Sequence, residues 1–379
     1  MEKCIETSKP MIFQGERAID QMVELCLRVT GGGKIALFYN EDSHQLAYDI
    51  GKILGKVGIF TLGVDASKKE NILQSKLQEV RIVIGVGDRR VGDIARLFAS
   101  DVQIDCILLP SALPNIDMMR RKIVQNGRYS TVQSPLAVVC DTRIVQASGL
   151  DIAGCIGELC AILTDSLDLT FWAYCGDKSY LIYADYLADK IKSVIDVLAC
   201  TQNKAGLLQE SVLEIGKYLS GKDIPATPTQ YFGIISGYWG NIGNLADGIR
   251  KMIGASTIAK IYTQMLKLDN MRSPNLDIVQ QVQHLAKSID IPQVDILNRI
   301  DLSDKTFHKA VLQEYHNELY DKAVCTNSII KRASKEFRRA LYANGVELGE
   351  FVDGKLPAEL AKYAGILDGN NSILSLIYR

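Results

Sequence analysis

Apolar and polar positions along the first 148 residues predict helices and strands that follow one another in turn. Helical spacing of apolar residues marks segments 15–30, 43–54, 70–78 and 93–98. Short apolar and β-branched runs, typical of parallel strands covered on both faces, mark segments 34–39, 58–63, 80–84, 106–109 and 137–140. This alternation predicts an α/β fold with a doubly wound parallel sheet that carries helices on both faces.

The pattern changes after residue 149, where amphipathic helical segments replace the strands. Examples cover 183–199, 207–219 and 276–288, and glycines divide the tail from 345 to 379 into short helices and loops. We therefore expect a Rossmann-like, nucleotide-binding type of domain at 1–148 and an all-helical domain at 149–379. A cleft between them, at the carboxyl ends of the strands, would hold a small-molecule ligand.

A glycine turn at 85–87 carries the most informative chemistry. The buried run before it predicts a strand, and Gly85 and Gly87 allow a sharp turn and a close backbone approach. The segment from Asp93 predicts a helix, whose N-terminal amides favour an anion. This is the outline of a site for a dinucleotide pyrophosphate, although a plain turn between a strand and a helix fits the same glycines.

A longer correspondence favours the nucleotide interpretation. The segment 85–96 resembles the GVGGGRVIDVAK turn of glycerol-1-phosphate dehydrogenases, in the superfamily of dehydroquinate synthases, glycerol dehydrogenases and iron-containing alcohol dehydrogenases. Two glycines of that turn are replaced by Asp88 and Arg89. Identical residues occupy seven positions: Gly85, Val86, Gly87, Arg90, Val91, Asp93 and Ala95. Further similar segments follow in the family's order at 107–113, 135–142, 153–168 and 224–231.

The resemblance runs from about Phe13 to about Leu266 and implies a dehydroquinate synthase-like fold, with a nucleotide-binding first domain and a helical second domain that carries a metal site. In the family, one carboxylate and two histidines hold Zn or Fe. Glu158 occupies the acidic position, but Tyr231 replaces the first histidine, and the second falls on an aliphatic residue. That residue is Ile253, or Met252 if the gap shifts by one. The histidine ligands of the expected metal are therefore missing, and we predict no metal site.

The four histidines of the chain stand elsewhere, at His44, His284, His308 and His316.

The resemblance and the turn together assign candidate cofactor-binding residues. They are Gly85, Gly87, Asp88, Arg89, Arg90, Asp93, Ser111 and Asp141. Asp88 places a carboxylate where a pyrophosphate would approach, whereas Arg89 and Arg90 could pair with phosphate. Asp141 stands at the end of its predicted strand, where its side chain could point into the expected cleft or could equally cap the following turn. We expect NAD(P) binding to be weakened or lost.

Whether the protein is an enzyme stays open at this point. One hypothesis is a noncatalytic or repurposed relative of glycerol-1-phosphate dehydrogenase, a pseudoenzyme. The other is an active NAD(P)-dependent polyol or polyol-phosphate dehydrogenase that works without the usual metal, in which Glu158 assists proton transfer and Tyr231 or Asn115 binds the substrate oxygen. Asn115 could equally cap a helix. A synthase of the dehydroquinate type, suggested by 113–117, would also need the missing metal.

Composition excludes several classes of partner. The chain has 379 residues and a net charge of −1, and its basic residues are interspersed with acidic ones, so neither nucleic acid nor an anionic membrane is an expected partner. The first ten residues lack the apolar core of a secretory signal, and Pro225 and Pro228 interrupt the charge-free window 224–246. We expect a cytoplasmic protein, and the resemblance implies a homodimer.

Overall fold

The computed structural model describes residues 10–31, 33–68, 79–125, 128–238, 243–267, 283, 287, 306–348, 355–368 and 372–378. The chain divides into two compact units. The first contains Met1–Asp151 and Gln209–Asp223, and the second contains Ile152–Leu208 and Ile224–Arg379.

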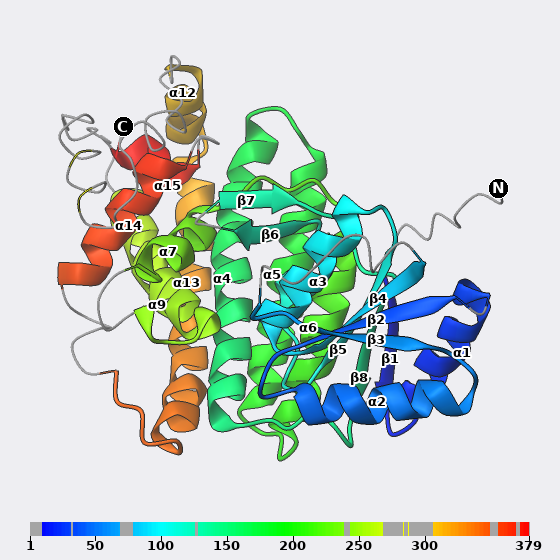
Figure 1. Ribbon diagram of the computed structural model, residues 1–379. Helices are drawn as coiled ribbons and strands as arrows, with labels where there is room; N and C mark the ends of the chain where they lie inside the picture. The colour runs from blue at the N-terminus through cyan, green and yellow to red at the C-terminus, as the bar shows by residue number, and fades with distance from the viewer. Residues whose placement is uncertain are drawn as a thin grey trace. The chain divides into compact units, whose positions relative to one another are not determined.

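A six-stranded sheet forms the centre of the first unit (Figure 1). Its strands follow the order β1-β8-β5-β4-β2-β3, and every pair of neighbours is parallel. The strands are β1 (Met11–Gly15), β2 (Lys34–Tyr39), β3 (Thr61–Asp65), β4 (Val80–Gly87), β5 (Asp105–Pro110) and β8 (Ala137–Asp141). The predicted parallel sheet is confirmed.

Helices cover both faces of this sheet because alternate strand residues point to opposite sides. Ile35 and Leu37 of β2 lie in one core cluster with residues of α1 (Ala18–Thr30) and α2 (His44–Lys56). Ala36 and Phe38 lie in the other cluster with α3 (Arg89–Asp101). The sheet is therefore doubly wound, as its apolar strands predict.

The structure also contains elements that the pattern does not predict. Strand β1 forms the edge of the sheet beside β8, and a 3-10 helix η3 (Ile116–Met119) precedes an antiparallel pair, β6 (Lys122–Gln125) and β7 (Arg128–Thr131). Strand β3 begins three residues later than expected, because Gly58 has a φ of 82° and belongs to the turn before it. The helix predicted at 70–78 lies outside the described residues.

Every secondary-structure element that the structure describes after residue 148 is a helix, as predicted. These are α4 (Gly149–Tyr174), α5 (Ser179–Leu198), α6 (Lys204–Ser220), α7 (Pro228–Ser236), α9 (Asp247–Met265), α12 (Thr306–Glu314), α13 (His316–Tyr342), α14 (Lys355–Leu367) and α15 (Ile373–Tyr378). Almost all of the segment predicted at 276–288 lies outside the described residues. None of the described helices is both long and apolar enough to cross a bilayer.

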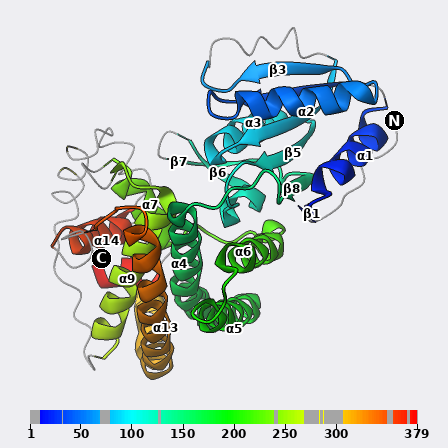
Figure 2. The same ribbon diagram turned by 90° about the horizontal axis from the view of Figure 1, so that it is seen from below.

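The centre of the second unit is α4, which is buried on all sides over most of its length. Helices α9 and α13 run beside it (Figure 2), and α7 packs against α9. The candidate metal position consists of Glu158 on α4, Tyr231 on α7, and Met252 or Ile253 on α9. The packing of these three helices therefore determines its geometry.

Candidate functional site

The glycine turn of the first unit has the backbone that the sequence predicts. Gly87 has a φ of 137°, and a Cβ at this position would stand 2.7 Å from Ser43 Oγ, so only glycine fits. Asp88 follows as the N-cap of α3, and its carboxylate accepts a hydrogen bond of 3.0 Å from the amide of Val91. Asn40 Nδ2 lies 3.5 Å from the other carboxylate oxygen. The protein's own carboxylate therefore satisfies an amide that could otherwise bind an anion.

The two arginines after Asp88 differ in their surroundings. Arg89 is half-buried and forms ion pairs with Asp93 at 3.5 Å and with Asp117 at 3.1 Å. Arg90 is exposed. Burial raises the pKa of Asp93, and the positive charges of Arg89 and Arg96 oppose this shift. The guanidinium of Arg89 thus already forms ion pairs with two carboxylates of the protein.

The remaining candidates of the first unit also have protein partners. Asn115 caps η3 by accepting a 3.0 Å hydrogen bond from the amide of Met118. Ser111 is joined to the glycine turn through its backbone amide, which donates to Gly87 O at 3.1 Å. The buried carboxylate of Asp141 accepts hydrogen bonds from Arg143 and from the amide of Ile19. These bonds outweigh burial and lower the pKa of Asp141.

A buried ion pair occupies the candidate metal position of the second unit. Glu158 lies on α4, and Lys251 Nζ of α9 stands 2.8 Å from its Oε1. The same ammonium lies 3.1 Å from Asp247 Oδ2, one helical turn earlier on α9. Glu158 and Lys251 are only 4% and 5% exposed, so both charges are desolvated.

Glycines let the three helices approach closely enough for this contact. A Cβ on Gly157 of α4 would stand 1.8 Å from Gly248 O of α9, so the backbones of these helices meet at this point. On the other side, a Cβ on Gly233 of α7 would lie 3.4 Å from Lys251 Cγ. The lysine stem therefore runs across the face of α7 on its way to Glu158.

A second group of acidic residues is buried farther along α4. Asp168 accepts hydrogen bonds of 2.9 Å from Tyr262 Oη and from the amide of Ile373. Desolvation, together with the charges of Asp368 and Asp165, raises the pKa of Asp168 well above its ordinary value. The folded state therefore favours the protonated acid.

We expect Asp168→Asn to stabilise the protein more as the pH rises. Because its pKa is higher in the folded than in the unfolded chain, Asp168 stabilises the fold below its unfolded pKa, and this stabilisation disappears as the pH rises through the folded pKa. The isosteric amide does not titrate, so the variant should exceed the wild type by about 1 kcal/mol or more near pH 7 and match it near pH 4. Denaturant unfolding measured across this range tests the prediction, and a pH-independent difference would contradict it.

Comparisons with known proteins identify distant relatives and a shared fold. No family model matches the chain. Over 240 residues it is 23% identical to the glycerol-1-phosphate dehydrogenase [NAD(P)+] of Methanosarcina barkeri, covering 58% of this chain and 67% of that protein. Glycerol dehydrogenase from Schizosaccharomyces pombe shares the fold with a TM-score of 0.55 and 15% identity, over 89% of this chain and 92% of that one. An iron-containing alcohol dehydrogenase from Thermococcus thioreducens has a TM-score of 0.53 and 11% identity, over 98% and 96% of the two chains.

The chain is a distant homologue of glycerol-1-phosphate dehydrogenases and shares the fold of glycerol dehydrogenase and iron-containing alcohol dehydrogenase. The names of these proteins give NAD(P)+ for the Methanosarcina dehydrogenase and iron for the Thermococcus dehydrogenase. The α/β sheet followed by an all-helical region is the glycerol dehydrogenase-like fold.

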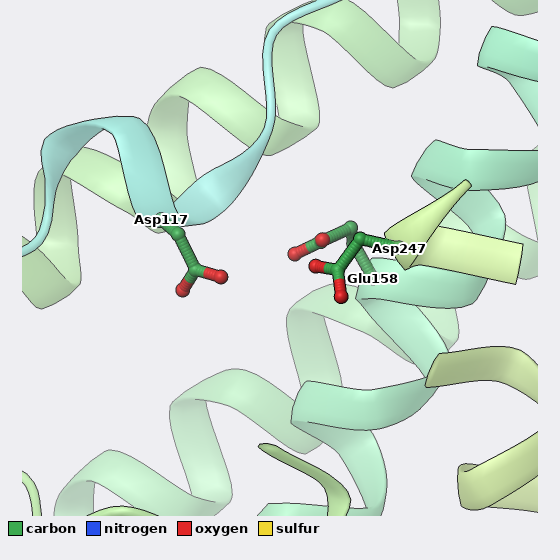
Figure 3. A group of neighbouring side chains, drawn as sticks. All are labelled: Asp117, Glu158 and Asp247. Carbon is green, nitrogen blue, oxygen red and sulfur yellow. The ribbon is translucent and has the colours of Figure 1, made fainter. Parts of the chain in front are cut away.

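Acidic side chains capable of holding a metal are present, but the remaining ligands of a histidine-held site are not. Carboxylate oxygens of Glu158 and Asp247 lie within 4.8 Å of each other (Figure 3). Asp117, also labelled there, belongs to the first unit. Met252 and Ile253 are buried apolar residues, and Tyr231 is half-buried on α7. The donor set does not fit a histidine-held divalent ion, because a protein ammonium lies against both carboxylates of this unit.

Sequence reasoning identified Glu158 but missed Lys251. One signal was available: Lys251 follows Asp247 by four residues, next to the apolar pair at the second histidine position. Its distance from Glu158 depends on how α4 and α9 pack, which periodicity does not specify.

Proposed function

We propose that this protein is a divergent relative of glycerol-1-phosphate dehydrogenase that has lost metal-assisted hydride transfer and has been repurposed for noncatalytic binding. The capping of α3 by Asp88 carries the proposal. A pyrophosphate approaching this turn would meet a carboxylate already bonded to the helix amide, and the two like charges repel each other. Arg89, which could offset this repulsion, is paired with Asp93 and Asp117.

The candidate metal position supports the same proposal from the second unit. Hydride transfer in a metal-dependent dehydrogenase relies on a Lewis acid to polarise the substrate oxygen. Lys251 lies against the carboxylates of Glu158 and Asp247, and neither histidine of the family pattern is present.

Calorimetric titration of the purified protein with NAD(H) and NADP(H), with and without Zn²⁺, tests the proposal directly. We expect no saturable nucleotide binding and no oxidation of glycerol or glycerol 1-phosphate in the presence of NAD(P)+. Turnover above background would overturn the proposal.

Removing the charge of Asp88 should strengthen nucleotide binding without destabilising α3. Asparagine caps a helix about as well as aspartate, so Asp88→Asn should unfold within about 0.5 kcal/mol of the wild type. We expect this variant to bind NADH at least about tenfold more tightly than the detection limit set by the wild type, because the repulsion of the pyrophosphate disappears.

The Asp88→Ala variant is the matched control, since it removes both the charge and the cap. It should lose about 1 kcal/mol of stability through the missing cap. Unchanged NADH affinity in the asparagine variant would mean that Asp88 does not face the phosphate.

A metal-free polyol or polyol-phosphate dehydrogenase is the second candidate, and the Glu158–Lys251 pair favours it. Its ammonium is a positively charged hydrogen-bond donor, and its carboxylate is a base within 2.8 Å. If this candidate holds, Glu158→Gln abolishes turnover while the fold, measured by circular dichroism, stays intact. Unchanged turnover in this variant would exclude it.

The partner of the repurposed protein is, in our proposal, a small molecule bound by the turns at the carboxyl ends of β4 and β5.

The superfamily resemblance also leads us to propose a homodimer. Sedimentation equilibrium of the full chain tests this proposal, and a monomer at all concentrations would contradict it.

A further inference from the structure

We propose that Lys251 serves as the resident cation of the candidate metal position, so that its ammonium replaces a divalent ion between Glu158 and Asp247. This inference concerns what holds the two carboxylates together, and it does not depend on whether the protein turns over NAD(P).

The distances support an internal cation. Nζ of Lys251 stands 2.8 Å from Glu158 and 3.1 Å from Asp247, so one positive centre binds two carboxylates that come from different helices. A metal ion bridges carboxylates in the same manner, by charge and by direct contact with their oxygens. The lysine thus joins α4 to α9 at the level of Glu158.

Charge balance points the same way. Asp247 also pairs with Arg250 Nη2 at 3.2 Å, and Arg250 donates to the backbone oxygen of Gly233. In the part of the second unit that the structure describes, these ion pairs form a group of two carboxylates and two protein cations, whose formal charges cancel. A divalent ion added to it would leave excess positive charge beside two largely buried cations, which is costly in a desolvated site.

The packing of three helices encloses the lysine side chain. Gly157 and Gly248 bring α4 and α9 into backbone contact, and Gly233 leaves space for the lysine stem on α7. Lys251 itself is 5% exposed. An ammonium without its carboxylates would be strongly disfavoured in such a place, so the pair and the helix packing depend on each other.

Zinc titration by calorimetry, on chelator-treated protein, tests the inference. We expect the wild type to show no saturable Zn²⁺ binding, and Lys251→Ala to bind Zn²⁺ at least about tenfold more tightly, because the ammonium between Glu158 and Asp247 is removed. Lys260→Ala removes an exposed lysine of the same helix and should behave like the wild type.

Two outcomes would overturn the inference. One is stoichiometric Zn²⁺ binding by the wild type that disappears in Glu158→Gln. The other is a Zn²⁺ affinity of Lys251→Ala that equals that of the wild type.

Native protein provides a second test if the alanine variant fails to fold. Its thermal midpoint should shift by less than about 1 °C between excess chelator and excess Zn²⁺, because a ligand that binds the folded state raises the midpoint. A Zn²⁺-dependent rise that Glu158→Gln removes would place a metal at this position and contradict the inference.

Discussion

Lys251→Met is expected to lower the free energy of unfolding by about 3–5 kcal/mol, because it removes the ammonium that lies 2.8 Å from the buried carboxylate of Glu158. Methionine nearly matches the length of the lysine stem, so the loss reports the missing ammonium rather than a cavity. Glu158 is 4% exposed, and little solvent is available to take over the role of Lys251. Denaturant unfolding followed by circular dichroism measures the effect.

The double variant Lys251→Met with Glu158→Gln isolates the pair. Removing both charges should restore most of the stability, because a buried neutral amide costs far less than a buried carboxylate. Lys260→Met, at an exposed position of the same helix, should change stability by less than about 0.5 kcal/mol. If the double variant is no more stable than Lys251→Met, the lysine acts through packing and not through charge.

Gly157→Ala should cost about 3 kcal/mol, although alanine is the better helix former. Its Cβ would stand 1.8 Å from Gly248 O and 3.1 Å from Met252 Cβ, so α4 and α9 must separate. Separation of the helices would also lengthen the Lys251–Glu158 contact, adding an electrostatic loss to the steric one. Thermal and denaturant unfolding of the variant measure the combined effect.

Gly154→Ala is the matched control, three residues earlier on α4. No atom lies within 4 Å of the added Cβ, so this variant should gain about 0.5–1 kcal/mol from its helix propensity. The two substitutions are chemically identical and differ in what the new methyl group meets. Equal effects of both would mean that the close approach of α4 and α9 is not required for stability.

The predicted fold succeeds where the local pattern and the tertiary environment agree. The run 34–39 is mostly apolar because β2 is covered on both faces, and its predicted bounds match those of the strand. Strand β1 was missed, because it pairs with β8, which lies more than 120 residues away along the chain. Its strand character comes from that partner and not from its own composition.

The contacts of the candidate site also differ in whether the sequence could predict them. The sequence identified Asp88 at the glycine turn because the glycines and the charge are neighbours along the chain. The N-cap that Asp88 forms on α3 also involves only neighbouring residues. Asn115 has a comparable role at η3, which is one of the two alternatives that its sequence context left open. Both contacts span only three residues, so neighbouring positions along the chain suffice to suggest them.

By itself, then, the sequence determined the α/β sheet, the helical region after it, the glycine turn and the absence of histidine at the metal-ligand positions. Only the tertiary structure decided that Lys251 meets Glu158, which lies 93 residues away along the chain. The physical reason is that local periodicity reports which face of a helix is apolar, whereas a distance between two helices depends on how closely their backbones pack. Here Gly157 and Gly248 set that distance, and the ammonium of Lys251 then reaches the carboxylate.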